Sequence, residues 1–284
     1  MKNLIYNENC LVTLERMESN TIDLVVTSPP YDDLRDYKGY SFPFEDIVAE
    51  LYRVMKDGGV VVWVVGDAMV KGSETLTSFK QALFFKDIGF NVHDTMIYEK
   101  IGGSPPNGNR YVQTFEYMFV FSKGKPKSIN LLKDKPNKSA GTKPWGASKI
   151  RKQDGSLETK KRKTYDEYGL RTNIWGYARG YGHSSQDLES FKHPATFPES
   201  LARDHILSWS NEGDLVYDPF MGSGTTAKMC ILHGRDFIGS EISKEYCLII
   251  EERLSKLANW ERQEIVPIEK TKKTVSLSDF IGDK

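Results

Sequence analysis

Cysteine, long apolar runs and net charge are all scarce in this 284-residue sequence. Its three cysteines, Cys10, Cys230 and Cys247, are far apart and form no Cys-x-x-Cys pair. This usage argues against a disulfide framework or a zinc cluster and is typical of a reducing cytoplasm. The five histidines show no ligand spacing either, so we expect no metal site.

No apolar run approaches the roughly 20 residues that a membrane helix needs, and the N-terminus lacks the hydrophobic segment of a signal peptide. We therefore expect no membrane partner. Hydrophobic residues make up 39% of the chain and aromatic residues 12%, which is ample for a packed core. The length fits one large α/β domain or a domain with a sizeable insertion.

The zero net charge conceals an asymmetry along the chain. Residues 123–192 contain 17 Lys and Arg against 7 Asp and Glu, a net charge of +10, so the remainder of the chain is −10. A basic segment beside an acidic scaffold is the distribution expected of a module that contacts phosphates. A solvated lysine-rich loop would have the same composition, and charge alone does not separate the two.

Strands and helices are predicted to alternate outside this basic segment. Short β-branched runs predict strands, and apolar residues at helical spacing predict helices. The expected strands are residues 4–6, 21–26, 60–65, 91–99, 117–121, 215–217 and 236–240. The expected helices are residues 11–17, 44–55, 76–88, 198–209, 225–233 and 244–257. The alternation favours a mostly parallel, doubly wound α/β sheet, and Gly58-Gly59 is expected to end the second helix.

Two loops that follow predicted strands contain the most informative motifs. One is Thr27-Ser28-Pro29-Pro30-Tyr31, and the other is Asp218-Pro219-Phe220-Met221-Gly222-Ser223-Gly224-Thr225-Thr226. Open α/β sheets bind their ligands where such loops leave the strands. Gly222 and Gly224 allow a sharp turn and a close approach of the backbone to a ligand. Glu241 ends the next strand, where an acid that binds ribose hydroxyls would lie.

The glycine-rich motif alone is compatible with NAD, FAD or S-adenosylmethionine. A Walker-type phosphate loop is excluded because no Gly-Lys-Ser/Thr follows. Asp218 favours S-adenosylmethionine, since its carboxylate could pair with a methionine amino group that a pyrophosphate cofactor lacks. Together, the two motifs resemble the DNA amino-methyltransferases, which use S-adenosylmethionine to methylate the exocyclic nitrogen of cytosine or adenine.

The order of the two motifs, catalytic loop first and glycine loop last, is similar to that of the permuted β class. The resemblance extends from about Asn3 to about Leu254. It implies a Rossmann-like sheet of seven strands, with an antiparallel hairpin strand inserted at one edge and the N-terminal strand paired beside the cofactor half. The implied organisation is a catalytic half (1–122), an inserted basic target-recognition region (123–192), a cofactor-binding half (193–260) and a polar tail (261–284).

The resemblance also implies the cofactor contacts. Residues 193–198 resemble the segment that surrounds the methionine end of the cofactor. Asn9 stands where relatives often have an acid that binds the adenine amino group, and its amide oxygen would accept that bond without charge assistance. The expected S-adenosylmethionine contacts are Asn9, Cys10, Thr27, Thr196, Phe197, Pro198, Asp218, Phe220, Gly222, Ser223, Gly224, Thr225 and Glu241.

The catalytic loop would orient the target amine. An exocyclic amine is a poor nucleophile because its lone pair is delocalised into the ring, so transfer depends on orientation. Ser28 Oγ and the Pro29 carbonyl are candidate acceptors for its N–H bonds, and Pro29 with Pro30 fixes the loop. Tyr31 would stack on a base flipped out of the duplex. No cysteine lies in a Pro-Cys motif, which argues against a cytosine-C5 methyltransferase.

Several alternatives remain open from the sequence. Ser28 favours cytosine N4, since adenine-N6 enzymes of this type more often have Asp or Asn there, but either side chain can accept an N–H bond. RNA and protein amide methyltransferases usually place the glycine loop first and lack a basic insertion. A dinucleotide oxidoreductase would leave residues 28–31 unexplained. A catalytically inactive DNA-binding module would not need both motifs.

Double-stranded DNA is the implied partner. The basic run 160–163 would contact phosphates, while other residues of the insertion would recognise bases; a surface lysine would explain Lys100 equally well. The candidate DNA contacts are Lys100, Lys160, Lys161, Arg162, Lys163, Arg171, Trp175 and Arg179. The resemblance further implies a monomer or homodimer in the cytoplasm, near the nucleoid, of bacterial, archaeal or phage origin. A cognate restriction endonuclease acting on the same site is a candidate partner.

Overall fold

The computed structural model of the chain describes residues 2–30, 42–102, 108–143, 145–146, 148–160, 163–180, 182–185, 187–192 and 198–257. The chain forms two compact units, of which the larger comprises Met1–Asn130 with Asn173–Lys284 and the smaller is Leu131–Thr172. The smaller unit therefore begins and ends inside the basic region predicted at 123–192. Residues on both sides of it belong to the larger unit; Asn130, for example, donates its backbone N–H to Ser208 O at 2.8 Å.

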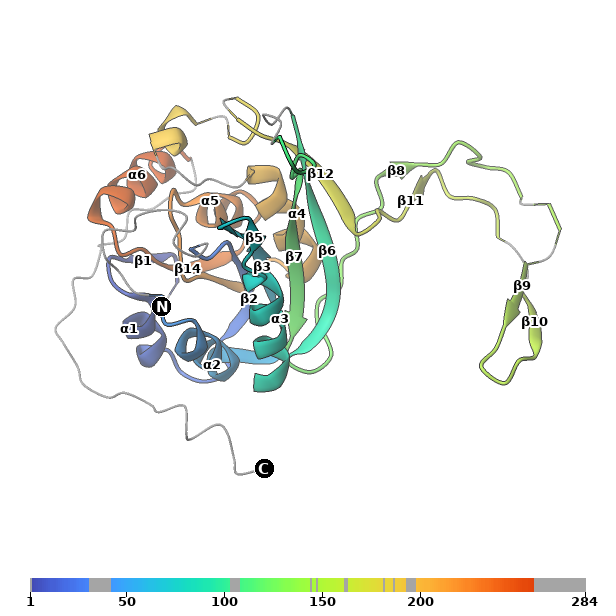
Figure 1. Cartoon of the computed structure of the whole chain (residues 1–284), viewed down its shortest axis with the longest axis horizontal. Helices are drawn as coiled ribbons and strands as arrows, with labels where there is room; N and C mark the ends of the chain where they lie inside the picture. Colours follow the sequence, from blue (N-terminus) through green and yellow to red (C-terminus); the bar gives the residue numbers. More distant parts are fainter. Residues whose placement is uncertain are drawn as a thin grey trace. The chain divides into compact units, whose positions relative to one another are not determined.

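The larger unit is built on an eight-stranded sheet (Figure 1). In spatial order its strands are β1 (Leu4–Tyr6), β14 (Asp236–Ser240), β13 (Leu215–Asp218), β2 (Ile22–Thr27), β3 (Met55–Val65), β7 (Phe115–Ser122), β6 (Asn91–Ile101) and β12 (Ile174–Ala178). Neighbouring strands pair in parallel except at β7, which is antiparallel to both β3 and β6. The predicted mostly parallel α/β sheet is confirmed, as is the pairing of the N-terminal strand beside the cofactor half.

The prediction of seven strands was wrong by one, because β12 adds a parallel strand outside β6. The antiparallel strand β7 thus lies two strands in from this edge. β12 lies in the segment assigned to the insertion, and the glycine-rich sequence there gave no pattern that predicts a strand. Gly176 allows the close pairing, since a Cβ there would lie 2.8 Å from Ile101 Cδ1 of β6.

Six helices pack in two groups among the described residues. The first group is α1 (Cys10–Arg16), α2 (Phe44–Val54) and α3 (Thr77–Ile88), and the second is α4 (Glu199–Trp209), α5 (Thr225–Leu232) and α6 (Lys244–Leu254). Alternate residues of β3 divide between the faces of the sheet: Val61, Trp63 and Val65 join the core cluster of the first group, whereas Val62 and Val64 are buried outside it. The sheet is therefore covered on both faces, as its apolar strands predicted.

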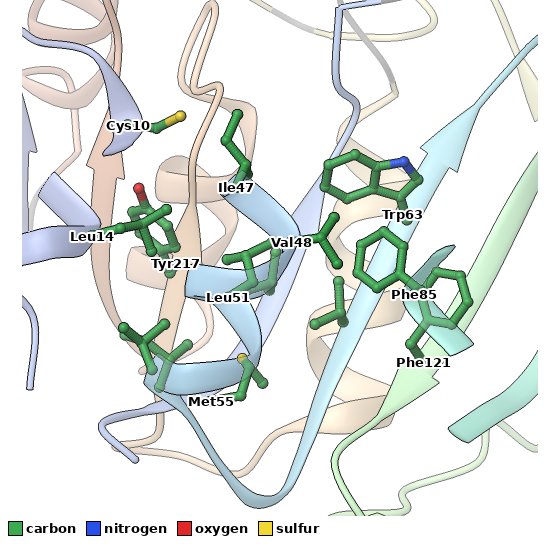
Figure 2. Close-up of a cluster of buried hydrophobic side chains, with 14 of the residues drawn as sticks. Cys10, Leu14, Ile47, Val48, Leu51, Met55, Trp63, Phe85, Phe121 and Tyr217 are labelled. Carbon is green, nitrogen blue, oxygen red and sulfur yellow. The ribbon is translucent and has the colours of Figure 1, made fainter. Parts of the chain in front are cut away.

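The core on the side of the first group is rich in aromatic rings (Figure 2). The rings of Phe85 and Phe121 stack with centroids 4.2 Å apart, and Trp63 Nε1 donates to Gln81 Oε1 at 2.8 Å. Figure 2 also shows Leu51, in the last turn of α2, and Met55, the first residue of β3. The predicted helix end at Gly58-Gly59 was wrong, because the helix ends at Val54 and both glycines lie in β3.

The smaller unit contains two short antiparallel pairs. β8 (Lys135–Pro136) pairs with β11 (Tyr168–Gly169), and β9 (Ser148–Arg151) pairs with β10 (Leu157–Lys160). Its 42 positions include 12 Lys and Arg against 5 Asp and Glu, a net charge of +7. A third pair, β4 (Met69–Val70) with β5 (Ser73–Glu74), belongs to the larger unit. Within the described ranges, no helix has the length and apolarity to cross a membrane.

Candidate active site

The glycine loop, residues 219–224, connects β13 to α5. Gly222 and Gly224 have φ values of 53° and 78°, in the left-handed region that favours glycine. A Cβ on Gly224 would also lie 2.7 Å from Ile250 Cγ2 of α6. The loop can therefore turn tightly against α6 only because these positions lack side chains.

Asp218 ends β13 immediately before this loop and is only 2% exposed. Its Oδ1 accepts hydrogen bonds from Thr27 Oγ1 at 2.7 Å and from the backbone N–H of Phe220 at 3.0 Å. Burial raises the pKa of Asp218 to about 6, and the hydrogen bonds from Thr27, Phe220 and Thr226 partly oppose that rise. The carboxylate is thus held in place from two directions.

The same contacts join the two motifs that the sequence analysis singled out. Thr27 ends β2, the strand beside β13, so its bond to Asp218 links the start of the catalytic loop to the start of the glycine loop. Thr226 of α5 adds a second link, donating from Oγ1 to Val26 O at 3.2 Å. Two loops almost 190 residues apart in the sequence therefore leave the sheet side by side, each directly after its strand as predicted.

Glu241 follows β14 and is 7% exposed. Its Oε2 accepts the backbone N–H of Gly222 and its Oε1 that of Ser243, both at 2.8 Å. The pKa of Glu241 is raised to about 7, because burial and, to a smaller extent, the nearby Asp218 outweigh the backbone hydrogen bonds that lower it. The predicted contact with ribose hydroxyls stays a prediction, but the carboxylate also fixes the glycine loop, which the sequence did not reveal.

The catalytic loop begins directly after β2. Pro29 is buried, while Ser28 and Pro30 are half-buried. Tyr31 lies outside the described residues, as do Thr196 and Phe197 of the predicted cofactor set. Pro198 is described and buried, and it precedes the first turn of α4.

Two predicted adenine-side residues lie at the start of α1. Asn9 caps this helix, its Oδ1 accepting the backbone N–H of Leu11 at 2.9 Å. Burial raises the pKa of the Cys10 thiol to about 12, so the thiol is neutral and packs as an apolar group. Helix capping already explains Asn9, and its predicted adenine contact stays a prediction.

The other residues of the predicted cofactor set belong to the glycine loop and its flanks. Phe220 packs edge-to-face against Phe42 and Trp63, with centroids 5.6 and 6.2 Å away. Ser223 and Thr225 are buried. Their packing holds the loop against the sheet and α6. These residues therefore determine the conformation of the loop, and their predicted contacts with the cofactor stay predictions.

Lys100, near the end of β6, and Glu116, near the start of β7, lie at the same end of these two antiparallel strands. Lys100 Nζ and a Glu116 carboxylate oxygen form an ion pair at 2.5 Å. Gly66, just after β3, is next to this pair, since a Cβ there would lie 3.3 Å from Glu116 Cγ. The positive charge of Lys100 is thus neutralised locally, and its DNA contact stays a prediction.

Trp175, one of the predicted DNA contacts, packs inside the larger unit. It lies in β12, is 6% exposed, and its ring is 4.6 Å from that of His205 on α4. Neighbouring Tyr177 donates from its hydroxyl to Asp204 Oδ2 at 2.7 Å. These aromatic residues dock the edge strand onto α4. Packing already explains Trp175, and its predicted DNA contact stays a prediction.

The remaining DNA candidates divide between the two units. In the smaller unit, Arg171 forms a two-point ion pair with Asp134, including Nε to Oδ1 at 3.1 Å, and Lys163 is exposed. Lys160 ends β10, while Lys161 and Arg162 lie outside the described residues. In the larger unit, Arg179 follows β12 and donates its backbone N–H to Ile101 O at 3.3 Å.

Nothing in the sequence indicated the ionic cluster that lies beside the glycine loop. Its members come from four separate segments, so that each one alone resembles an ordinary surface charge: Asp187, Glu199, Lys228 and Arg253. Of the residues that the structure describes, no three His, Cys, Asp or Glu are grouped so as to hold a metal ion.

The residues of the site fit the chemistry of S-adenosylmethionine. The glycine loop allows the close backbone approach that a nucleoside ligand needs, and two buried carboxylates, Asp218 and Glu241, flank it. Carboxylates are acceptors for amino and hydroxyl groups, which S-adenosylmethionine presents at its two ends. The fold and this site together define an S-adenosylmethionine-dependent methyltransferase.

Comparisons with known proteins identify the family. A family model described as DNA methylase, specific for the N6/N4 type, matches residues 22–252. The orphan methyltransferase M.BamHII of Bacillus amyloliquefaciens is 62% identical over 241 residues, covering 84% of this chain and 91% of that protein. The chain therefore belongs to the N6/N4 DNA methylase family, the DNA amino-methyltransferases.

Solved structures agree with this fold. The PvuII DNA methyltransferase (cytosine-N4-specific) superposes with a TM-score of 0.65 at 22% identity, covering 90% of this chain and 86% of that one. The M1.HpyAVI–SAM complex superposes with a TM-score of 0.58 at 24% identity, covering 88% of this chain and 99% of that one.

Proposed function

We propose that this DNA methyltransferase transfers the methyl group of S-adenosylmethionine to the exocyclic N4 of a cytosine flipped out of double-stranded DNA. The observation that carries the proposal is the direct link between the two loops, Thr27 Oγ1 to Asp218 Oδ1 at 2.7 Å. Methyl transfer needs the amine and the methyl donor held together in one orientation. A rigid link between the base-side loop and the cofactor-side loop supports that requirement.

Each loop has a distinct task in this proposal. Asp218 and Glu241 would accept hydrogen bonds from the methionine amino group and the ribose hydroxyls of S-adenosylmethionine. When bound, the cofactor supplies an electrophilic methyl group on its sulfonium. Ser28 Oγ and the Pro29 carbonyl would accept the N–H bonds of the target amine, and Tyr31 would stack on the flipped base.

Cytosine is favoured over adenine by the residue at position 28. Ser28 has a short hydroxyl side chain where adenine-N6 enzymes of this type more often have Asp or Asn. The cytosine-N4-specific PvuII methyltransferase, a structural neighbour along most of the chain, supports the same choice. Adenine N6 is the alternative product of the same site.

Recognition of the DNA is assigned to the smaller unit, Leu131–Thr172. Its net charge of +7 contrasts with −7 for the rest of the chain, and positive charge neutralises phosphates. The exposed Lys163 is one such group, and Trp145, which is 99% exposed, offers an aromatic face for a base. The relative M.BamHII is described as an orphan methyltransferase, which favours action without a dedicated endonuclease.

The decisive experiment is identification of the methylated product. The purified chain is incubated with S-adenosylmethionine and duplex DNA, and the DNA is digested to nucleosides for mass spectrometry. We expect N4-methylcytosine, and none of it with Ser28→Ala. N6-methyladenine would overturn the choice of base and leave the reaction class intact. Transfer of labelled methyl groups to RNA or protein in preference to DNA would overturn the proposed substrate.

A further inference from the structure

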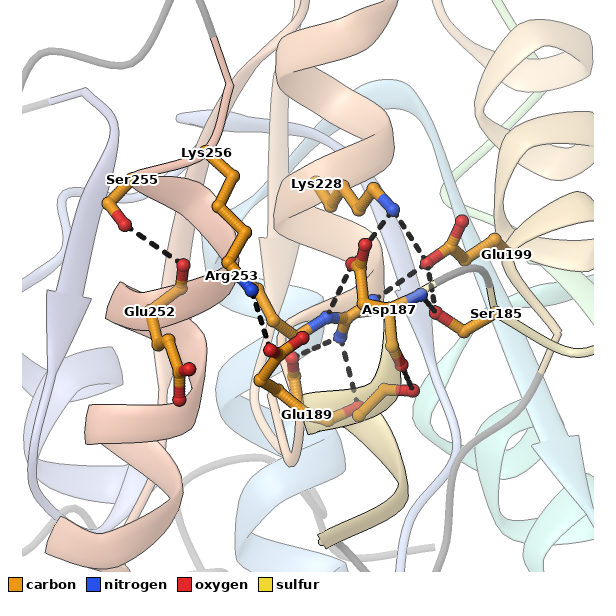
Figure 3. Close-up of polar contacts among 11 residues, drawn as sticks. Ser185, Asp187, Glu189, Glu199, Lys228, Glu252, Arg253, Ser255 and Lys256 are labelled. Atoms are coloured by element: carbon orange, nitrogen blue, oxygen red, sulfur yellow. Dashed lines mark hydrogen bonds and ion pairs between the residues drawn. The ribbon is translucent and has the colours of Figure 1, made fainter. Parts of the chain in front are cut away.

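Two buried cations and two half-buried carboxylates form an electrically balanced cluster beside the glycine loop (Figure 3). The side chain of Arg253, on α6, is fully buried; its Nε donates to Asp187 Oδ2 at 3.0 Å and its Nη2 to Glu199 Oε1 at 2.8 Å. Lys228, on α5, donates to the same two oxygens at 2.8 and 2.9 Å. Two cations thus share two carboxylates, which offsets much of the desolvation that burial imposes on each charge.

Unlike the side chain of Lys228, the side chain of Arg253 also donates hydrogen bonds to the glycine loop. Its Nη1 donates to the Ser223 carbonyl oxygen and, at 3.2 Å, to Ser223 Oγ. The other side of the same planar peptide is also held, because Gly224 N–H donates to Met221 O at 2.8 Å. Ile250, one turn earlier on α6, fills the space beside Gly224. Helix α6 therefore fixes the orientation of the peptide between Ser223 and Gly224.

The carboxylates of the cluster also fix a second part of the chain. Asp187 and Glu199 lie on either side of residues 193–198 in the sequence, the segment predicted to contact the methionine end of the cofactor. Ser185 Oγ donates to Glu199 Oε1 at 2.6 Å and accepts the backbone N–H of Asp187 at 3.0 Å. Residues before and after that segment are consequently bound to the same guanidinium that holds the glycine loop.

We propose that Arg253 is a positioning residue for S-adenosylmethionine binding, which acts by fixing the peptide between Ser223 and Gly224. The role depends on the fork of the guanidinium, because its three nitrogen atoms serve three partners at once: Ser223, Asp187 and Glu199. A lysine supplies the same charge from a single nitrogen. Lys228 Nζ binds the same two carboxylates, whereas its contact with the loop is the backbone N–H bond to Gly224 O, which a substitution of its side chain keeps. Lys228 therefore separates charge neutralisation from loop positioning within one cluster.

Three variants of the full chain test this role. Arg253→Met and Lys228→Met each remove one cation and keep an unbranched side chain, and both are expected to lower the free energy of unfolding in urea. Calorimetric titration with S-adenosylmethionine, without DNA, is expected to show about 10-fold or greater weakening for Arg253→Met, because the charged hydrogen bonds to Ser223 are lost. For Lys228→Met we expect less than about 3-fold weakening, because the loop contact remains.

Arg253→Lys is the third variant. It keeps the positive charge that Arg253→Met removes, but it lacks the three nitrogen atoms of the guanidinium. It is expected to recover unfolding stability but not cofactor affinity, and its KM for S-adenosylmethionine should rise more than its kcat falls. Equal weakening by Arg253→Met and Lys228→Met, or full recovery of affinity in Arg253→Lys, would overturn the proposal. If Arg253→Met does not fold, the comparison of Arg253→Lys with Lys228→Met decides alone. Since binding is measured without DNA, the outcome is independent of whether cytosine or adenine is the target.

Discussion

The buried carboxyl of Glu241 should make both the stability and the cofactor affinity of the protein depend on pH. Burial raises its pKa from 4.5 to about 7 in the folded chain. The folded state therefore holds this proton more tightly than the unfolded state does between these two values. The sign follows from linkage: this group lowers the stability of the cofactor-free protein as pH rises from 4.5 through 7, and the full penalty is present above pH 7.

The size of the effect follows from the shift in pKa. A rise from 4.5 to about 7 corresponds to about 3 kcal/mol of unfolding free energy. Glu241→Gln removes the titration, although its amide can accept only one of the two backbone N–H groups of Gly222 and Ser243. That loss is independent of pH. The wild-type stability minus the variant stability should therefore fall by about 3 kcal/mol between pH 4.5 and pH 8, whatever its starting value.

Urea unfolding of the cofactor-free chain across this pH range measures that difference. Glu212→Gln, which removes an exposed carboxylate of the same unit, is the matched control. Cofactor affinity should change in the opposite sense, because ribose hydroxyls are bound best by the ionised carboxylate. We expect the Kd for S-adenosylmethionine to increase as pH falls below about 7, by up to about tenfold per pH unit. A difference curve that stays flat, or affinity that improves on acidification, would refute the role assigned to Glu241.

Two further predictions separate the parts of the site. Ser28→Ala should lose turnover while its affinity for S-adenosylmethionine stays within a few-fold of wild type, whereas Asp218→Ala should weaken cofactor binding directly; calorimetry giving the reverse pattern would contradict the division between the two loops. Trp175→Ala should lower the free energy of unfolding by about 3–5 kcal/mol and leave the methylated sequence unchanged. Neutralising residues 160–163 should instead weaken binding to all DNA sequences, and should reduce the slope of log binding constant against log salt concentration by about 0.9 per lost phosphate contact. A change of sequence preference in the Trp175 variant would restore it as a base-contacting residue.

The sequence predicted the parts of the fold that local patterns specify. The striped helix predicted at 44–55 agrees with the structure to one residue, and the apolar run 60–65 is a strand that begins earlier, at Met55. The two loop motifs were located correctly because each follows directly on such a strand. Gly58-Gly59 misled because glycine ends helices as readily as it permits close strand packing, and here tertiary pairing decided between the two.

Features that depend on distant partners were missed for a physical reason. β12 pairs with β6 across more than 70 residues of sequence, and no local period indicates that pairing. Arg253 resembles an ordinary surface charge until folding places it against Asp187 and Glu199. Glu241 was correctly singled out as an acid at the end of a strand, but its hold on the Gly222 amide arises only from the folded loop.

The strand order β1-β14-β13-β2 has a consequence for how the protein is made. Two strands from the C-terminal part of the chain separate two strands from its beginning, so Leu4 of β1 pairs with Ile238 of β14. During synthesis, β1 and β2 emerge from the ribosome long before the strands that must fill the space between them. Contacts so distant in sequence form slowly, because the loop must close before they stabilise anything. The cofactor site therefore assembles only after β13 and β14 have emerged from the ribosome. We expect a chain truncated before residue 215 to expose unpaired strand edges at which aggregation begins.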